Sequence, residues 1–186
     1  MRKDLGKKAL LYPQPVLIIG TYNDDKTPNA MVAAWGCVND FDKVTICIDK
    51  THKTMDNIRA NKCLTVSMAT AANIKQLDYL GITSGHKVAD KFAKSGLSAV
   101  KSKKVKAPII RELPLTLECK VLSYDEETEL LYTQVVGVSA DESILNAKGK
   151  VDIKKLCPLC YDPEGHGYYA LGEKIGNAFK DGKSIK

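Results

Sequence analysis

Hydrophobic and polar positions alternate in three stretches within the first fifty residues. Residues 15–22 and 29–38 read as extended runs, and residues 43–49 place Val44, Ile46 and Ile48 on one side. The polar segments NDDKTP and NDFD lie between these runs and are typical of tight turns. The pattern therefore predicts three antiparallel strands joined by short turns.

Helical signals follow the third predicted strand. We expect a helix over residues 51–62, with Thr54 as its N-cap, Asp56 in its first turn and Arg59 near its end. Further predictions are a strand at 63–69, helices at 72–80 and within 88–97, a hairpin of 114–124 with 130–140, a partly helical connection at 142–156 and a last strand at 168–172. Strands joined by tight turns outnumber helices, which predicts an antiparallel barrel with inserted helices.

Composition indicates one globular domain over residues 1–186, with terminal extensions at 1–10 and 173–186. Of the 186 residues, 44% are hydrophobic and 27% charged, and no apolar run is long enough for a membrane span. The start of the chain lacks the features of a signal peptide, so we expect a cytoplasmic protein. Its six cysteines are then expected as reduced thiols.

The net charge of +6 is concentrated partly in KSKKVK at 101–106. No aromatic residue is interleaved there for base stacking, so we interpret this segment as a solvated loop and expect no nucleic-acid partner. A modest positive field would still attract a small anion such as a nucleotide.

The segment PNAMVAAWG at 28–36 is the first candidate for binding chemistry. Small side chains on a strand allow a flat ligand to approach the backbone, and Trp35 would form an aromatic wall beside it. The alternative is a closely packed sheet with Trp35 in the core, and this segment alone favours that alternative.

Two further segments have the character of anion sites. A helix beginning at Thr54 exposes free N–H groups beside a hydroxyl and Lys53. Ser84, Gly85 and Lys91 combine a hydroxyl, a close backbone approach and an ammonium group. Taken alone, the first segment is better explained as an ordinary capped helix, and the second is only a weak signal.

The pair Cys157 and Cys160 raises the possibility of redox or metal chemistry. Zinc requires two more ligands, and only His166 lies nearby in the sequence. We therefore favour a structural role for this pair over a metal site or a disulfide. No triad of nucleophile, base and acid can be assembled, so no catalytic residue is assigned.

The order of PVLIIGTYN, PNAMVAAWG, HKTMDNI, SGHKVADKF, LECKV and YYALG resembles the flavin reductase-like family of the FMN-binding split-barrel superfamily, and within it the flavoredoxin group. The resemblance covers about residues 6–172. It implies a mainly β fold, an antiparallel Greek-key split barrel with peripheral helices, and a homodimer that holds one FMN per subunit.

By the same resemblance, residues of the small-residue segment would lie along or near the flavin: Asn29, Ala30, Met31, Ala33, Ala34, Trp35, Gly36 and Cys37. Thr54, helped by His52 and Lys53, would hold the phosphate or the ribityl chain, and Ser84, Gly85 and Lys91 would complete the polar end. Tyr161 would cover the ring.

The resemblance favours an FMN-dependent oxidoreductase, with no metal ion and no membrane partner. One version takes hydride from NAD(P)H and passes it to an acceptor, and the other carries electrons between protein partners. The alternatives from other classes are a non-catalytic flavin- or heme-binding module and a metal protein built on Cys157 and Cys160.

Overall fold

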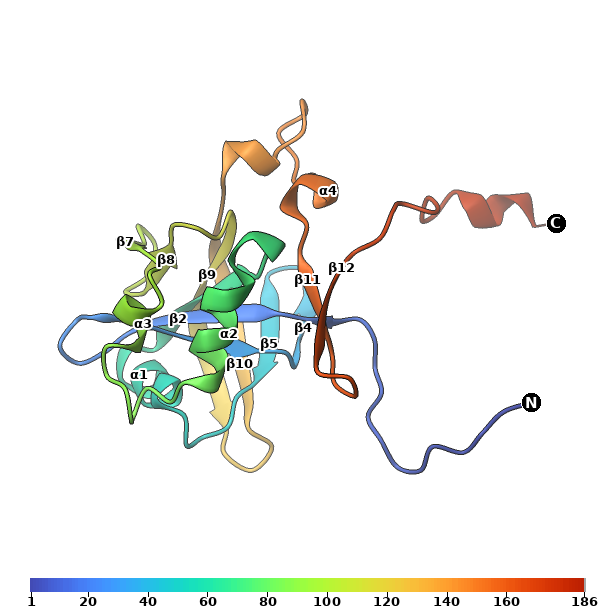
Figure 1. Cartoon of the computed structure of the whole chain (residues 1–186). Coiled ribbons are helices and arrows are strands. Elements are labelled where there is room, and N and C mark those ends of the chain that lie inside the picture. Colours follow the sequence, from blue (N-terminus) through green and yellow to red (C-terminus); the bar gives the residue numbers. More distant parts are fainter. Residues whose placement is uncertain (186) are drawn as a thin grey trace.

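The computed structural model describes residues 1–185, and its largest element is a seven-stranded antiparallel sheet (Figure 1). The strands follow the order β3-β2-β6-β9-β10-β5-β4 across this sheet. Their bounds are Leu17–Tyr22 for β2, Pro28–Ala33 for β3, Gly36–Asp40 for β4, Lys43–Cys47 for β5, Cys63–Met68 for β6, Leu115–Asp125 for β9 and Leu130–Ala140 for β10.

A bend at Ala34 and Trp35 closes this sheet into a split barrel. The single strand predicted over 29–38 is wrong, because β3 and β4 are separate strands that lie at opposite ends of the sheet order. β3 pairs with β2 and β4 pairs with β5, so the two-residue connection carries the chain from one edge of the sheet to the other. The predicted antiparallel Greek-key split barrel with peripheral helices is confirmed.

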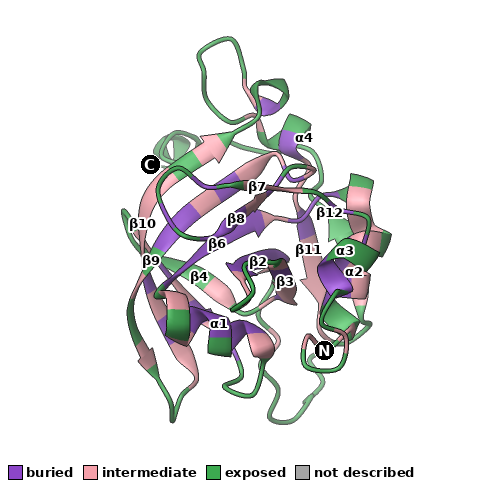
Figure 2. Cartoon of the chain, turned by 90° about the vertical axis from the view of Figure 1, so that its left-hand side faces the viewer, coloured by how far each residue is buried: buried purple, intermediate pink, exposed green. Residues whose placement is uncertain are grey.

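Two hydrophobic clusters fill the space inside the barrel and beneath its helices. The first joins strand residues such as Ile19, Ile46 and Leu131 to Met55 and Ile58 of α1 (Lys53–Asn61). The second joins Ile18 and Ala30 to the helices α2 (Ile74–Ile82) and α3 (Lys91–Lys94). Figure 2 shows the buried residues gathered on the central strands and on the inward faces of the helices. Burial of these side chains is the main favourable term in folding.

The helix predicted over 51–62 forms, but Thr54 is not its N-cap. His52 occupies the N-cap position, without a side-chain capping bond, and Thr54 lies within the first turn. The side chain of Thr54 instead accepts a hydrogen bond from Asn29, so a tertiary partner replaces the local one. The predicted short helix at 88–97 reduces to α3, and Gly96 follows it with a φ of 75°.

Two smaller sheets complete the fold. β1 (Gln14–Pro15), β11 (Leu159–Asp162) and β12 (Gly167–Ala170) form one, and β7 (Ala99–Lys101) with β8 (Pro108–Ile110) forms the other. The connection 142–156 is partly helical as predicted, with a 3₁₀ turn at Glu142–Ile144 and α4 at Ile153–Leu156. Further 3₁₀ turns lie at Ala71–Asn73 and Asp181–Ser184.

The lysine-rich segment lies between β7 and β8, neither of which was predicted. Its four lysines are exposed, as expected of a solvated loop, whereas Ser102 and Val105 are buried and anchor it. None of the helices within residues 1–185 has both the length and the apolar character needed to cross a bilayer.

Candidate functional site

A hollow of about 240 Å³ lies between β3, the start of α1, the end of α2 and the loop before α3. We call it the cationic hollow. The predicted site residues that line it are Met31, His52, Lys53, Thr54, Ser84, Gly85 and Lys91. Three segments that are distant in sequence therefore meet at one place.

Gly85 allows the loop before α3 to approach α1 closely. A Cβ atom at this position would lie 3.1 Å from Cβ of Lys53 and 3.2 Å from Oδ1 of Asn29. Such distances are shorter than ordinary van der Waals contact, so a larger residue would push the loop away. The close approach brings backbone groups of the loop to the edge of the cationic hollow.

Buried amide and hydroxyl groups fix the start of α1 against the barrel. Asn29 donates from Nδ2 to Oγ1 of Thr54 at 3.0 Å, and Asn57 donates from Nδ2 to Oγ1 of Thr21 at 3.1 Å and to Oδ1 of Asn23 at 2.9 Å. Thr54 lines the hollow, whereas Asn29 lies beneath it. A network of this kind specifies one position for the helix relative to β2 and β3.

Lys91 supplies a buried cation at the inner wall of the cationic hollow. Only 4% of the residue is exposed, and its Nζ donates to the carbonyl oxygens of Leu80 at 3.0 Å and Thr83 at 2.9 Å. Burial lowers the pKa of this ammonium group to about 8. No carboxylate forms an ion pair with it among residues 1–185. An ammonium group has three donors, so the structure leaves capacity for an anion.

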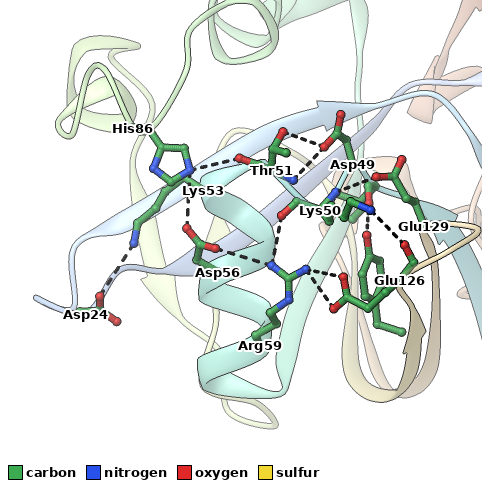
Figure 3. Close-up of polar contacts among 12 residues, drawn as sticks. Asp24, Asp49, Lys50, Thr51, Lys53, Asp56, Arg59, His86, Glu126 and Glu129 are labelled. Atoms are coloured by element: carbon green, nitrogen blue, oxygen red, sulfur yellow. Dashed lines mark hydrogen bonds and ion pairs between the residues drawn. The ribbon is translucent and has the colours of Figure 1, made fainter.

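Exposed polar contacts hold the outer side of the same region (Figure 3). Nε2 of His86 lies 3.2 Å from the carbonyl oxygen of Thr51 and 3.5 Å from Oδ2 of Asp56, which joins the loop before α3 to α1. Nζ of Lys53 lies 3.8 Å from Oδ2 of Asp24. Exposed ion pairs of this type contribute little stability, so Lys53 remains free to face a ligand.

A second hollow, of about 330 Å³, adjoins the first along β3. We call it the tyrosine hollow. Its lining is formed by Val16, Val32, Ala34, Asp78, Gly81, Ile82, Tyr161, His166 and Tyr168. Val32, Gly81 and Ile82 line both hollows, so the two lie side by side; we call the pair the trench, with a cationic end and an aromatic end.

Two polar pairs stand at the aromatic end of the trench. Oη of Tyr161 lies 2.8 Å from Nδ1 of His166, and Tyr168 donates from Oη to Oδ1 of Asp78 at 2.8 Å. Burial, followed by the bond to Asp78, raises the pKa of Tyr168 to about 12. The second pair therefore attaches the β11–β12 hairpin to α2. Sequence reasoning assigned neither His166, Tyr168 nor Asp78 to the site, although it noted the aromatic side chains near Tyr161.

Six predicted residues do not line the trench, and one of them is Asn29, which lies beneath the cationic hollow. Ala30 and Ala33 are buried in the hydrophobic clusters, and Trp35, Gly36 and Cys37 line a separate apolar hollow of about 390 Å³. Trp35 is 64% exposed, so the alternative that places it in the core is wrong. The bend at Ala34 and Trp35 separates these residues from Met31 and Val32.

Within residues 1–185, Cys157 and Cys160 are not grouped with other potential metal ligands. All six cysteines are free thiols, and Cys157 and Cys160 are partly buried. Across residues 1–185, no group of three histidine, cysteine or acidic side chains is arranged to hold a metal ion.

Comparison with known proteins agrees with the fold and with the order of these segments. The model of the flavin reductase like domain matches residues 9–168. The chain belongs to this family. Flavoredoxin of Desulfovibrio vulgaris (Miyazaki F) is 36% identical, with 98% of this chain and 100% of that chain covered and a TM-score of 0.92.

A flavoredoxin from Methanosarcina acetivorans is 28% identical over the whole length of both chains, with a TM-score of 0.89. An uncharacterized protein from Methanothermobacter thermautotrophicus is 29% identical, with 95% of this chain and 91% of the relative covered. These similarities extend over nearly the full chain, so this family member and the two flavoredoxin structures share one architecture.

Proposed function

We propose that this protein is an FMN-dependent oxidoreductase that transfers electrons through a flavin held in the trench. The observation that carries the proposal is that a cationic hollow and an aromatic-lined hollow lie side by side along β3. FMN has the matching form, because a phosphate is attached through a flexible chain to a planar ring. Family membership supports the same cofactor.

The cationic hollow fits the phosphate. Lys53 and Lys91 provide positive charge, Thr54 and Ser84 provide hydroxyl groups, and α1 begins at this point with free backbone N–H groups. Gly85 allows the loop to pack closely against Lys53 and Asn29, which brings the loop backbone to the edge of this hollow. This donor set suits a dianion, so we assign these residues to the phosphate end of FMN.

The tyrosine hollow fits the ring. Val32 and Ala34 give it an apolar wall on β3, and Tyr161 gives it an aromatic side opposite. Bound FMN would supply the redox chemistry, and the protein would contribute the position of the ring and the charges around it. We assign no contact with the ring to Trp35, because it lines a separate hollow.

Flavin binding is the first test. We expect the purified chain to bind FMN with a dissociation constant in the micromolar range or below, measured by quenching of flavin fluorescence. The Thr54→Ala variant is expected to bind FMN about tenfold more weakly, because a hydroxyl donor to phosphate is lost. Undiminished binding by this variant, a heme Soret band, or no uptake of FMN would contradict the proposal.

The source of electrons separates two versions of this function. Anaerobic addition of NADH and then NADPH would bleach the bound flavin rapidly if the protein is a reductase. Reduction by a ferredoxin-like protein alone would identify an electron carrier. We favour the reductase version, because the family model that matches residues 9–168 is that of the flavin reductase like domain. Bleaching by neither nucleotide would exclude that version.

We also propose that the protein forms a homodimer within the cytoplasm, as one domain per chain. Val38, Phe41 and Val138 are exposed apolar side chains that surround a hollow of about 390 Å³ beside β4 and β10. Clusters of this kind on a surface mark interaction sites. Six free thiols are compatible with a reducing compartment.

The dimer can be tested by one charge substitution. Phe41→Asp is expected to convert the dimer into a monomer in size-exclusion chromatography with light scattering, since a carboxylate would be desolvated in the interface. Phe179→Asp, an equally exposed phenylalanine in the C-terminal segment, serves as the matched control. A wild-type monomer at micromolar concentration would refute the dimer.

A further inference from the structure

The Tyr161–His166 contact closes one side of the tyrosine hollow. Tyr161 is half-buried on β11, whereas His166 is exposed in the turn before β12 and has a φ of 53°. This left-handed backbone places the imidazole next to the phenol, with Oη and Nδ1 2.8 Å apart. A non-glycine residue rarely adopts this conformation, so the position of His166 is a specific feature of the hairpin.

The direction of this hydrogen bond depends on the charge of His166. A charged imidazolium carries a proton on both nitrogens, so Nδ1 must donate and Oη of Tyr161 must accept. The phenol proton is then free to point into the hollow. When the imidazole is neutral with an unprotonated Nδ1, the phenol donates to it and offers the hollow only a lone pair.

We propose that Tyr161 and His166 form a two-residue unit that determines whether the aromatic end of the trench donates or accepts a hydrogen bond. In this unit Tyr161 is the contact residue and His166 is a positioning residue that acts through it. The inference rests on the proposed flavin site, and it assigns to that site a preference for a planar ring with an oxygen or nitrogen acceptor at its edge.

The charged groups around the Tyr161–His166 unit have hydrogen-bond or ion-pair partners of their own. The charged and titratable groups near His166 are Asp162, Glu164 and Tyr168 of the same hairpin, Asp78 of α2, and Lys8 and Tyr12 of the N-terminal segment. Tyr12 donates to Asp162, Lys8 pairs with Glu164, and Tyr168 donates to Asp78. Each acidic group therefore has its own hydrogen-bond or ion-pair partner, and Asp162 in addition interacts electrostatically with His166.

A pH dependence with a defined sign follows. Histidines in general change charge between about pH 5 and 8. An isoalloxazine edge consists mainly of acceptors, so a donating Tyr161 binds it better than an accepting one. Ring binding should thus be stronger with the charged form of His166, and we expect affinity to fall as the pH rises. The expected change is about fivefold, equivalent to one ordinary hydrogen bond.

Riboflavin is the probe that isolates this effect, because it lacks the phosphate and so does not involve Lys53 or Lys91. We expect the riboflavin dissociation constant, measured by fluorescence quenching, to rise about fivefold between about pH 5.5 and 8. Tyr161→Phe and His166→Gln should each abolish this slope. Their double variant should resemble either single variant, because the two side chains act as one unit.

Matched controls distinguish an effect of the Tyr161–His166 unit from the effects of other side chains. Tyr169→Phe removes an exposed hydroxyl of the same hairpin, and His86→Gln removes an exposed histidine elsewhere, so both should retain the wild-type slope. A slope that persists in His166→Gln, or additive losses in the double variant, would overturn the inference. If the wild type bound FMN but riboflavin affinity did not vary with pH, the unit would be refuted while the flavin site stood. Failure to bind either flavin would instead refute the proposed function.

Discussion

The two ends of the trench are built in different ways. The cationic hollow is formed where β3, α1 and the loop before α3 pack against one another, and Thr54 and Lys91 are almost completely buried there. The tyrosine hollow receives Tyr161, His166 and Tyr168 from one short hairpin, and Tyr168 donates to Asp78 of α2. The first site is enclosed by three packed elements, whereas the second depends on one hairpin, which pairs with β1 and packs Leu159 into the second hydrophobic cluster.

This difference implies that the two ends have different mechanical roles. A site fixed by core packing cannot adjust without cost, so it suits a ligand group of constant shape and charge such as phosphate. A site on a short hairpin whose second strand is partly exposed opens locally at lower free energy than a packed core, so it suits a surface across which donors and acceptors must pass. We therefore expect variants at the cationic end to act strongly on FMN alone, and variants at the aromatic end to act weakly on every flavin.

Gly85→Val should have the largest effect. The added side chain would meet Cβ of Lys53 and Oδ1 of Asn29, so the loop must move out of the cationic hollow. We expect FMN affinity, measured by fluorescence quenching, to fall by about 100-fold or more, as when several charge-assisted contacts are lost together. Gly172→Val, where a Cβ meets no atom within 4 Å, is the matched control. Equal FMN affinity in the two variants would show that the loop is not part of the site.

Lys91→Met should have the next largest effect, limited to the phosphorylated flavin. The substitution keeps most of the apolar stem and removes the buried charge, so FMN affinity should fall about tenfold to 50-fold while riboflavin affinity is unchanged. Lys87→Met, at an exposed lysine of the same loop, should leave both affinities unaltered. Loss of riboflavin binding would indicate a general structural role for Lys91.

The pKa of Lys91 gives this prediction a pH dependence. Burial lowers the pKa to about 8 in the free protein, and a neighbouring phosphate dianion would favour the ammonium form and raise it again. FMN affinity is therefore complete below about pH 8 and falls as the pH rises through the free and then the bound pKa. The decline should be absent in Lys91→Met and absent for riboflavin. An FMN affinity that is constant up to about pH 10 would contradict it.

The sequence indicated the residues that meet in the cationic hollow better than those that meet in the tyrosine hollow. The reason is that signals for the first are local in the chain, whereas those for the second are not. The helix start near Thr54 and the glycine beside Ser84 are signals carried by neighbouring residues. The order of those segments along the chain then indicated that they form one site. The bend at Trp35 has no such local signal, because Ala33, Ala34 and Trp35 include no proline, glycine, asparagine or aspartate, and the strand ends where the pairing partner changes from β2 to β5. The predicted residues on either side of that bend consequently face different hollows.

The aromatic end depends on contacts between residues far apart in the chain. Tyr168 meets Asp78 across 90 positions, and no periodicity or spacing in either segment indicates that contact. Thr54 shows the same limitation on a smaller scale, since its local signal predicted an N-cap and its actual partner is Asn29, 25 positions away. Tertiary partners of this kind override local propensity and become visible only in the folded structure.

Tyr168→Phe should have the smallest effect and should extend to every flavin. Loss of the hydroxyl removes the bond to Asp78 that attaches the β11–β12 hairpin to α2, while the ring that contacts Tyr161 remains. We expect affinities for FMN and riboflavin to fall equally, by about threefold, and hydrogen exchange of the hairpin amides to accelerate. Tyr169→Phe, which loses an exposed hydroxyl, should change neither quantity. A change limited to FMN would mean that the hairpin contributes to phosphate binding, and the division of the trench into a packed end and a hairpin end would then be wrong.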